Sequence, residues 1–115
     1  MNIQKQLLLI IMGLLLTLSS NESDAFENDE MFTIPYLEDA KIFAEFTDEL
    51  PAVINYFTAH NEQEIIRFYQ GKFGDAISSD MKRGRLTLYF NHEDKQLRVV
   101  ISPQGKKYQV DILLK

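Results

Sequence analysis

The last third of the chain alternates between apolar and polar residues, and this alternation constrains the fold more than any other feature of the sequence. It runs through residues 85–91, 96–102 and 107–114, which are separated by short polar links. A period of two predicts strands with one buried face, and short links between such strands predict an antiparallel meander. The residues expected to point inward are Leu86, Leu88, Phe90, Leu97, Val99, Ile101, Tyr108, Val110, Ile112 and Leu114.

Two earlier segments are also predicted to be strands. Residues 40–46 alternate with a period of two, and residues 52–59 are rich in the β-branched and aromatic side chains that favour strands. Both alternate sets of the second segment contain apolar groups, so either of its faces could meet a core. The face of the first segment that we expect to be apolar consists of Ala40, Ile42, Ala44 and Phe46.

One helix is predicted between these two groups of strands, from Glu62 to Phe73. Asn61 can cap its first turn, and Glu64, three residues later, completes a capping box. Gly74 stands where a terminating residue is expected. The side chains that recur at helical spacing and should face a sheet are Ile65, Ile66, Tyr69 and Phe73.

Together these elements predict an α+β fold, a two-layer sandwich with the order β-β-α-β-β-β. A curved antiparallel sheet of four to five strands would carry the single helix on one face. Residues 75–84 are expected to be a polar connection, and Pro103-Gln104-Gly105 a type I turn with glycine in the left-handed position. The domain is predicted to cover residues 35–115, preceded by a flexible acidic tail at 26–34.

The first 25 residues are expected to be a cleaved secretory signal peptide. Lys5 precedes twelve residues, 7–18, that are apolar except for one glycine and one threonine. A membrane-spanning helix needs about 20 apolar residues, so this stretch fits a signal better than an anchor. Small residues before position 26 predict cleavage after Ala25, with Ser19 or Ser20 as the alternative. No stable membrane span is then expected in the 90 residues that follow.

The chain contains no cysteine. Disulfides, thiol catalysis and thiolate metal sites are thereby excluded. Small extracellular domains of eukaryotes usually depend on disulfides, so an exported domain without them points to the bacterial envelope. We therefore expect a periplasmic or secreted location.

Four segments carry a resemblance to known sequences. They are Phe68-Tyr69, Phe73-Gly74, residues 82–88 (KRGRLTL) and residues 99–102 (VVIS). With these segments the chain resembles a group of small, uncharacterised bacterial exported proteins over most of residues 35–115. The resemblance implies a periplasmic location and no defined activity.

Charge is divided unevenly along the chain. Residues 26–66 contain ten acidic residues and one basic residue, whereas residues 67–115 contain five acidic and ten basic residues. Either the strands of both parts interleave and neutralise one another, or a basic face meets an acidic partner. The net charge of -5 for the whole chain and the lack of a recognisable motif argue against nucleic acid as that partner.

A basic surface is predicted on the outward face of the meander. Its arginines could bind carboxylate or phosphate groups through two N–H donors. The alternative is a solvated face whose long charged side chains discourage edge-to-edge pairing. The candidate partner- or anion-binding residues are Lys82, Arg83, Arg85, Tyr89, Arg98 and Lys107.

No catalytic or metal-binding constellation is recognisable. His60 and His92 are not tied to any serine by a known motif. His92, Glu93 and Asp94 are adjacent, and metal ligands usually come from several elements, so a solvated turn is expected there. We expect a non-enzymatic protein without metal or cofactor.

Three functions remain open from the sequence. The preferred one is a protein-interaction module of the bacterial envelope. The alternative is a binder of a small anionic ligand or an envelope polymer through the same basic face, and the third is a small hydrolase that uses His60 or His92.

Overall fold

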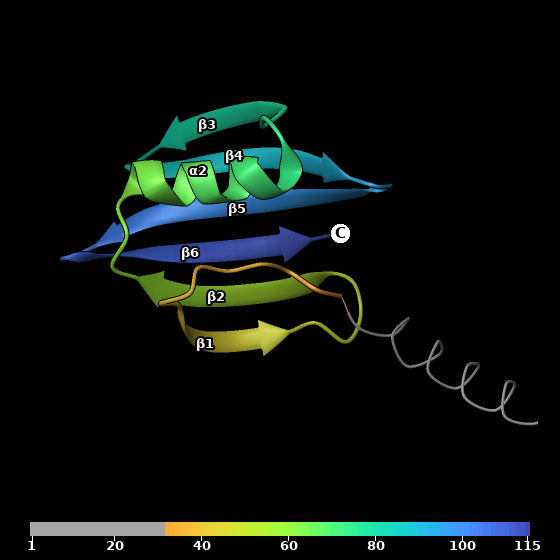
Figure 1. Cartoon of the computed structure of the whole chain (residues 1–115), viewed down its shortest axis with the longest axis horizontal. Helices are drawn as coiled ribbons and strands as arrows, with labels where there is room; N and C mark the ends of the chain where they lie inside the picture. Colours follow the sequence, from red (N-terminus) through yellow and green to blue (C-terminus); the bar gives the residue numbers. More distant parts are fainter. Residues whose placement is uncertain (1–31) are drawn as a thin grey trace, which may run out of the picture. The chain divides into compact units, whose positions relative to one another are not determined.

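The structure, a computed structural model, describes residues 32–115 (Figure 1). The predicted signal peptide and its cleavage after Ala25 lie outside the described residues. Within residues 32–115 there are six strands and one helix. They are β1 (Lys41–Phe46), β2 (Ala52–Thr58), α2 (Glu62–Phe73), β3 (Ser78–Lys82), β4 (Arg85–His92), β5 (Lys95–Gln104) and β6 (Lys107–Leu114).

All six strands form one open antiparallel sheet in the order β1-β2-β6-β5-β4-β3. The chain forms the β1–β2 hairpin, crosses the sheet through α2, and returns as the β3–β6 meander, whose last strand pairs with β2. The α+β class, the antiparallel sheet and the single helix are as predicted. The expectation of four to five strands is wrong, because the sheet has a sixth strand.

The additional strand is β3, which lies inside the predicted polar connection 75–84. All five of its side chains are exposed, and it pairs only with β4 at the edge of the sheet. A strand without a buried face has no apolar alternation, so the sequence pattern does not reveal it. Its turn into β4 is the two-residue Arg83-Gly84 turn, where both residues have positive φ (55° and 80°), as type I′ hairpins require.

The turn between β5 and β6 also differs from the prediction. Gln104 pairs with Lys107, so the turn is Gly105-Lys106 and not Pro103-Gln104-Gly105. Gly105 has positive φ (63°), as expected for that residue. Pro103 has no backbone N–H, so it cannot donate a hydrogen bond to a neighbouring strand. It is tolerated in β5 because it pairs only with Tyr108 of β6, and the pairing of β5 with β4 ends before it.

The inner face of the sheet forms the core, and the predicted inward residues of the meander all point to it. Eight of those ten are buried, and Leu86 and Tyr108 are half-buried. The facing of β2, open in the sequence, is settled by its burial pattern. Its buried residues are Ala52, Ile54, Tyr56 and Thr58.

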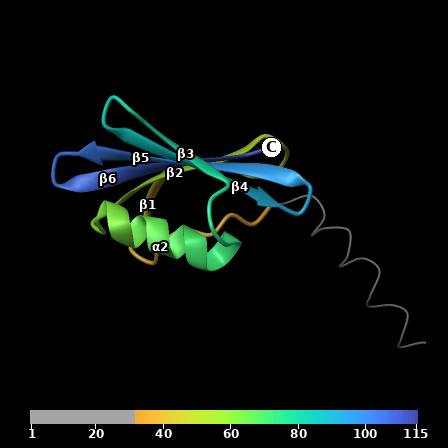
Figure 2. The ribbon, with the colours of Figure 1, turned by 90° about the horizontal axis from the view of Figure 1, so that it is seen from above.

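Two segments cover this inner face. Helix α2 lies over one part and residues 32–40 lie beside it on the same side of the sheet (Figures 1 and 2). Ile34 and Leu37 are buried in the core, and the N–H of Phe32 donates to the carbonyl of Thr47 (3.0 Å). Phe32 and Ile34 are thus part of the packed domain and not of a flexible tail, because their apolar side chains close the part of the inner face that the short helix leaves open.

A buried hydrogen-bond chain joins these covering segments to the sheet. The hydroxyl of Tyr69 donates to the carbonyl of Pro35 (2.9 Å), so the hydroxyl of Tyr56 must donate to that of Tyr69 (2.7 Å). Burial raises the pKa of Tyr56 to about 12 and also raises the pKa of Tyr69. Both phenols are therefore neutral at physiological pH and serve as structural hydrogen-bond donors.

A β-bulge in β1 changes which of its residues face the core. The register shifts between Ile42 and Ala44, so Ile42 lies opposite Tyr56 whereas Ala44 lies opposite Asn55 and Phe46 opposite Val53. Because an extra residue reverses the alternation, Ala44 and Phe46 face away from the core. The prediction that they share a face with Ile42 is wrong.

Candidate functional site

The outward face of the meander contains a hollow of about 400 Å³. It brings together five of the six predicted binding residues and lies on the sheet face that no other described element covers (Figure 2). We call it the cationic hollow. Its lining residues are Asp80, Lys82, Arg83, Arg85, Thr87, Tyr89, Arg98 and Val100.

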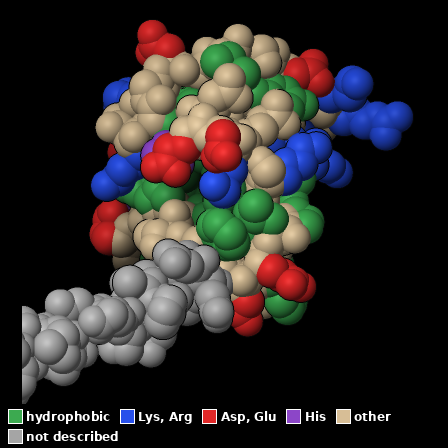
Figure 3. Space-filling view, turned by 90° about the vertical axis from the view of Figure 1, so that its right-hand side faces the viewer, with side chains coloured by type: hydrophobic (Ala, Val, Ile, Leu, Met, Phe, Trp, Pro, Cys, Tyr) green, Lys and Arg blue, Asp and Glu red, His purple; other side chains and the backbone are tan. Residues whose placement is uncertain are grey.

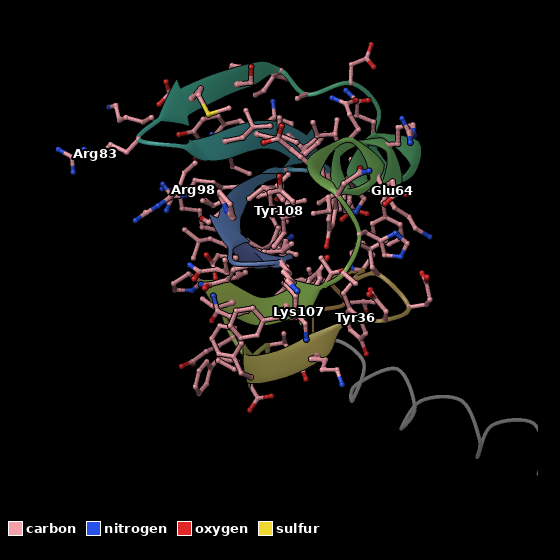
Figure 4. All side chains as sticks on the ribbon, turned by 90° about the vertical axis from the view of Figure 1, so that its left-hand side faces the viewer. Tyr36, Glu64, Arg83, Arg98, Lys107 and Tyr108 are labelled. Carbon is pink, nitrogen blue, oxygen red and sulfur yellow. The ribbon has the colours of Figure 1, made fainter. Side chains whose placement is uncertain are left out.

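Strand register places these side chains together. Lys82 pairs with Arg85 across the β3–β4 hairpin, and Tyr89 of β4 pairs with Arg98 of β5. Residues that pair across an antiparallel sheet point to the same face. Arg83 stands in the hairpin turn itself, and both Arg83 and Arg98 project away from the side that carries Glu64 of the helix (Figure 4).

The four cations of the hollow are available for a ligand. None of the ion pairs within residues 32–115 includes Lys82, Arg83, Arg85 or Arg98. Asp80 is the one carboxylate in the lining. Like charges directly opposite each other on a sheet are destabilising, so an anion bound between Lys82 and Arg85 would relieve their repulsion. Lys and Arg side chains also project from one margin of the molecule in the space-filling view (Figure 3).

Lys107, the sixth predicted residue, is outside the cationic hollow. It follows the Gly105-Lys106 turn and lines a separate, smaller hollow of about 110 Å³ with Lys41 and Phe57. The structure therefore does not bring it together with the other five.

Beyond the hollow, the same sheet face carries an exposed apolar surface that the sequence analysis missed. Phe43 and Phe46 are 52% and 67% exposed, and the rings of Phe43 and Phe57 lie 4.8 Å apart. We call this surface the aromatic patch. By strand register it consists of Phe43, Phe46, Val53, Phe57 and Leu113.

A hydrogen-bonded polar group on β2 and β6 lies beside Val53, Phe57 and Leu113 of the aromatic patch. Asp111 of β6 accepts hydrogen bonds from the side-chain amides of Asn55 (2.7 Å) and Gln109 (2.9 Å). Its carboxylate is thus occupied within the protein. The aromatic patch and the cationic hollow therefore meet directly where Leu113 pairs with Arg98, beside this polar group.

A second group of ionisable residues surrounds His60 on the other side of the sheet. Its Nε2 lies 3.0 Å from Oε2 of Glu38, and its Nδ1 lies 3.2 Å from Oε1 of Glu64. A neutral imidazole carries only one N–H, so both contacts can be hydrogen bonds only when the ring is protonated. Asp39 adds a third carboxylate, whose Oδ1 lies 3.8 Å from Nε2 of His60.

Two of the carboxylates around His60 are held in place by hydrogen bonds with nearby backbone and side-chain groups. Asn61 and Glu64 form the predicted capping box, which fixes Glu64 one turn from His60. Asp39 is held by the hydroxyl of Thr58 (2.6 Å) and the N–H of Ala59 (2.9 Å). The four-residue spacing of His60 and Glu64 could have indicated in advance that these two side chains lie close together. The contact of Glu38 with His60 depends on tertiary structure and has no such local signal.

The pKa values of the group shift in opposite directions. The hydrogen bond with Glu38 raises the pKa of His60, with the bond to Glu64 acting in the same direction. The backbone N–H of Asn61 and the bond to His60 lower the pKa of Glu64, and backbone and His60 bonds likewise lower the pKa of Glu38. Burial alone would raise the pKa of Asp39, but hydrogen bonds from Thr58 and Ala59 outweigh it and lower that pKa.

We expect the protein to become less stable as pH rises above neutrality because of His60. The pKa of His60 is higher in the folded than in the unfolded state, where it is about 6.5. Protonated His60 therefore contributes its full stabilisation below the unfolded pKa. This contribution is lost as pH rises through the folded pKa. The midpoint of thermal unfolding should therefore fall from mildly acidic to mildly alkaline pH. His60→Gln should remove this slope, and His92→Gln should retain it. An unchanged slope in His60→Gln would contradict the assignment.

The two histidines have different surroundings, with His60 among carboxylates and His92 beside an aromatic ring. His92 lies edge-on against the ring of Phe73, 5.2 Å away. No group of three or more His, Asp or Glu residues within 32–115 is arranged to hold a metal ion. No helix in the same region is long and apolar enough to cross a membrane.

Comparison with known proteins found no relative. No family model matches the chain, and neither a curated protein nor a solved structure matches it. The resemblance to small exported bacterial proteins therefore stays a prediction.

Proposed function

We propose that this chain is an exported, non-enzymatic protein-interaction module of the bacterial envelope that binds an acidic segment of another protein on its open sheet face. The observation that carries the proposal is the cationic hollow, which is lined by one tyrosine and by four cations that form no ion pair within residues 32–115. The apolar stretch at residues 7–18 supports export.

The extent of the face favours a protein over a small ligand. The hollow is open on the sheet surface, and the exposed rings of Phe43 and Phe46 continue the same face three strands away. Interfaces between proteins combine aromatic residues and arginine in this way. A small anion would contact the hollow alone and leave the aromatic patch uncovered.

The test uses a fluorescein-labelled hexaglutamate peptide and measures its binding by anisotropy. We expect weak binding that decreases steeply with salt, since the contact is between exposed charges. Arg85→Glu combined with Arg98→Glu should weaken binding by roughly tenfold or more, because losing each charge-assisted hydrogen bond costs about 1.5–3 kcal/mol.

A matched control separates the site from net charge. Arg67 and Lys72 are exposed on α2, so Arg67→Glu with Lys72→Glu changes the total charge equally but leaves the hollow intact. This control should bind hexaglutamate nearly as the unmodified protein does. Equal losses in both double variants would contradict the proposal. Inorganic phosphate that competes as strongly as the peptide would instead favour the alternative function, a binder of a small anionic ligand.

A further inference from the structure

One row of residues crosses the open face and links the cationic hollow to the aromatic patch. Strand register places Arg98 of β5 opposite Leu113 of β6, Leu113 opposite Val53 of β2, and Val53 opposite Phe46 of β1. Tyr89 of β4 continues the row on the other side of Arg98. The row therefore has a cation, Arg98, beside Tyr89 at one end and an exposed aromatic ring, Phe46, at the other end.

The spacing along this row is set by the sheet. Neighbouring strands lie about 4.8 Å apart, so Arg98 and Phe46, three strands apart, are separated by about 14 Å at the backbone. An extended chain advances about 3.3 Å per residue, and about four residues span that distance. In an extended segment, residues separated by four positions point to the same side.

The two ends of the row attract different chemistry. Arg98 and its neighbours Arg85 and Lys82 are unpaired within residues 32–115 and attract carboxylates. Phe46 is 67% exposed, and covering it would remove a large apolar area from water. Between the two ends the row consists of Leu113 and Val53, and Asp111 beside the row is already held by Asn55 and Gln109. The middle of a partner segment therefore needs no charged group.

We propose that the partner is an extended protein segment that lies across the strands, with a carboxylate side chain in the cationic hollow and an aromatic side chain, four residues away, on the aromatic patch. This inference rests on the proposed function and adds the chemistry and spacing of the partner. Charge complementarity at the hollow fixes the direction in which the segment lies on the face.

Two synthetic peptides of identical composition test the spacing. Each contains a pair of glutamates, one phenylalanine and a glycine-serine remainder. In the first peptide the phenylalanine stands four residues after the second glutamate, and in the other it follows that glutamate directly. The first peptide should bind about tenfold more tightly, since a buried aromatic side chain contributes about that factor or more.

Two variants of the protein test whether the tighter binding of the first peptide comes from the aromatic patch. Phe46→Ser should remove the preference for the first peptide and leave hexaglutamate binding unchanged. Met81→Ser is the matched control, because Met81 is similarly exposed (58%) but lies opposite Leu86 on the other side of the sheet. It should change neither measurement.

The outcomes separate the inference from the proposed function. Equal binding of the two peptides, or an advantage that survives Phe46→Ser, would overturn the inference while binding to the hollow still stood. Failure of both peptides and of hexaglutamate to bind would overturn the inference together with the proposed function. A concentration-dependent dimer that Phe46→Ser dissociates would show that a second copy covers the patch, which also overturns the inference.

Discussion

Replacing Tyr69 with alanine is expected to lower the free energy of unfolding by about 3–5 kcal/mol, the cost of truncating a large buried aromatic residue. The side chain of Tyr69 is fully buried beneath the helix, where its ring packs against Phe68 and Phe73. Its loss leaves a cavity and removes the donor to Pro35. A domain of this size is stable by roughly 4–13 kcal/mol, so urea unfolding should show a large fall in the midpoint.

The conservative change Tyr69→Phe measures the hydroxyl separately. It keeps the ring but leaves the carbonyl of Pro35 and the hydroxyl of Tyr56 without their shared partner, which should cost about 1–3 kcal/mol. Tyr108→Phe is the control, because Tyr108 is half-buried and its hydroxyl makes no hydrogen bond within residues 32–115. A Tyr69→Phe variant as stable as this control would contradict a structural role for the hydrogen-bond chain.

The parts of the fold that the sequence predicts well are those with a local or periodic signal. The Asn61–Glu64 capping box and the apolar spacing after it predict α2 with the bounds that the structure has. The alternation in 85–114 predicts the inward residues of three strands because each of those strands has one buried face. The capping box is an interaction between residues close in sequence, and the alternation is a pattern that short stretches of sequence display.

The features that the sequence does not predict depend on contacts between distant segments. Strand β3 is held at the edge by backbone hydrogen bonds to β4, and its exposed side chains carry no pattern. The bulge at Phe43 adds one residue, and it reverses the facing of everything after it in β1. Likewise, the short segment around Ile34 has no helical or strand periodicity, and the surface that Ile34 covers comes from strands distant in the sequence.

The candidate site was predictable to the same extent. Alternation assigns Arg85, Tyr89 and Arg98 to the outward face, and the structure groups them with Lys82 and Arg83. Lys107 shares that face but stands on β6 and lines a hollow with Lys41 and Phe57 of the first two strands, and a list of outward residues does not contain the strand order. Phe46 could not be assigned to the aromatic patch in advance, since it faces outward only because of the bulge.

Replacing Val99 with asparagine is expected to lower the free energy of unfolding by at least about 3 kcal/mol, because it removes a buried apolar side chain and buries an amide without a partner. Val99 is fully buried between Leu88 of β4 and Ile112 of β6. The effect combines burial of an amide without a partner with the loss of apolar packing around Val99. Loss of the cooperative transition in urea would be the extreme form of the same result.

Val100→Asn is the matched control, since it makes the same substitution one residue later in the same strand. Val100 lies on the open face between Thr87 and Asp111, where its side chain is half-buried and polar neighbours are available. Its cost should stay below about 1 kcal/mol, as for surface substitutions. A large difference between the two variants follows directly from the alternation of β5. Equal losses would mean that both faces of this strand are buried, and the open face would then not be free to bind any partner.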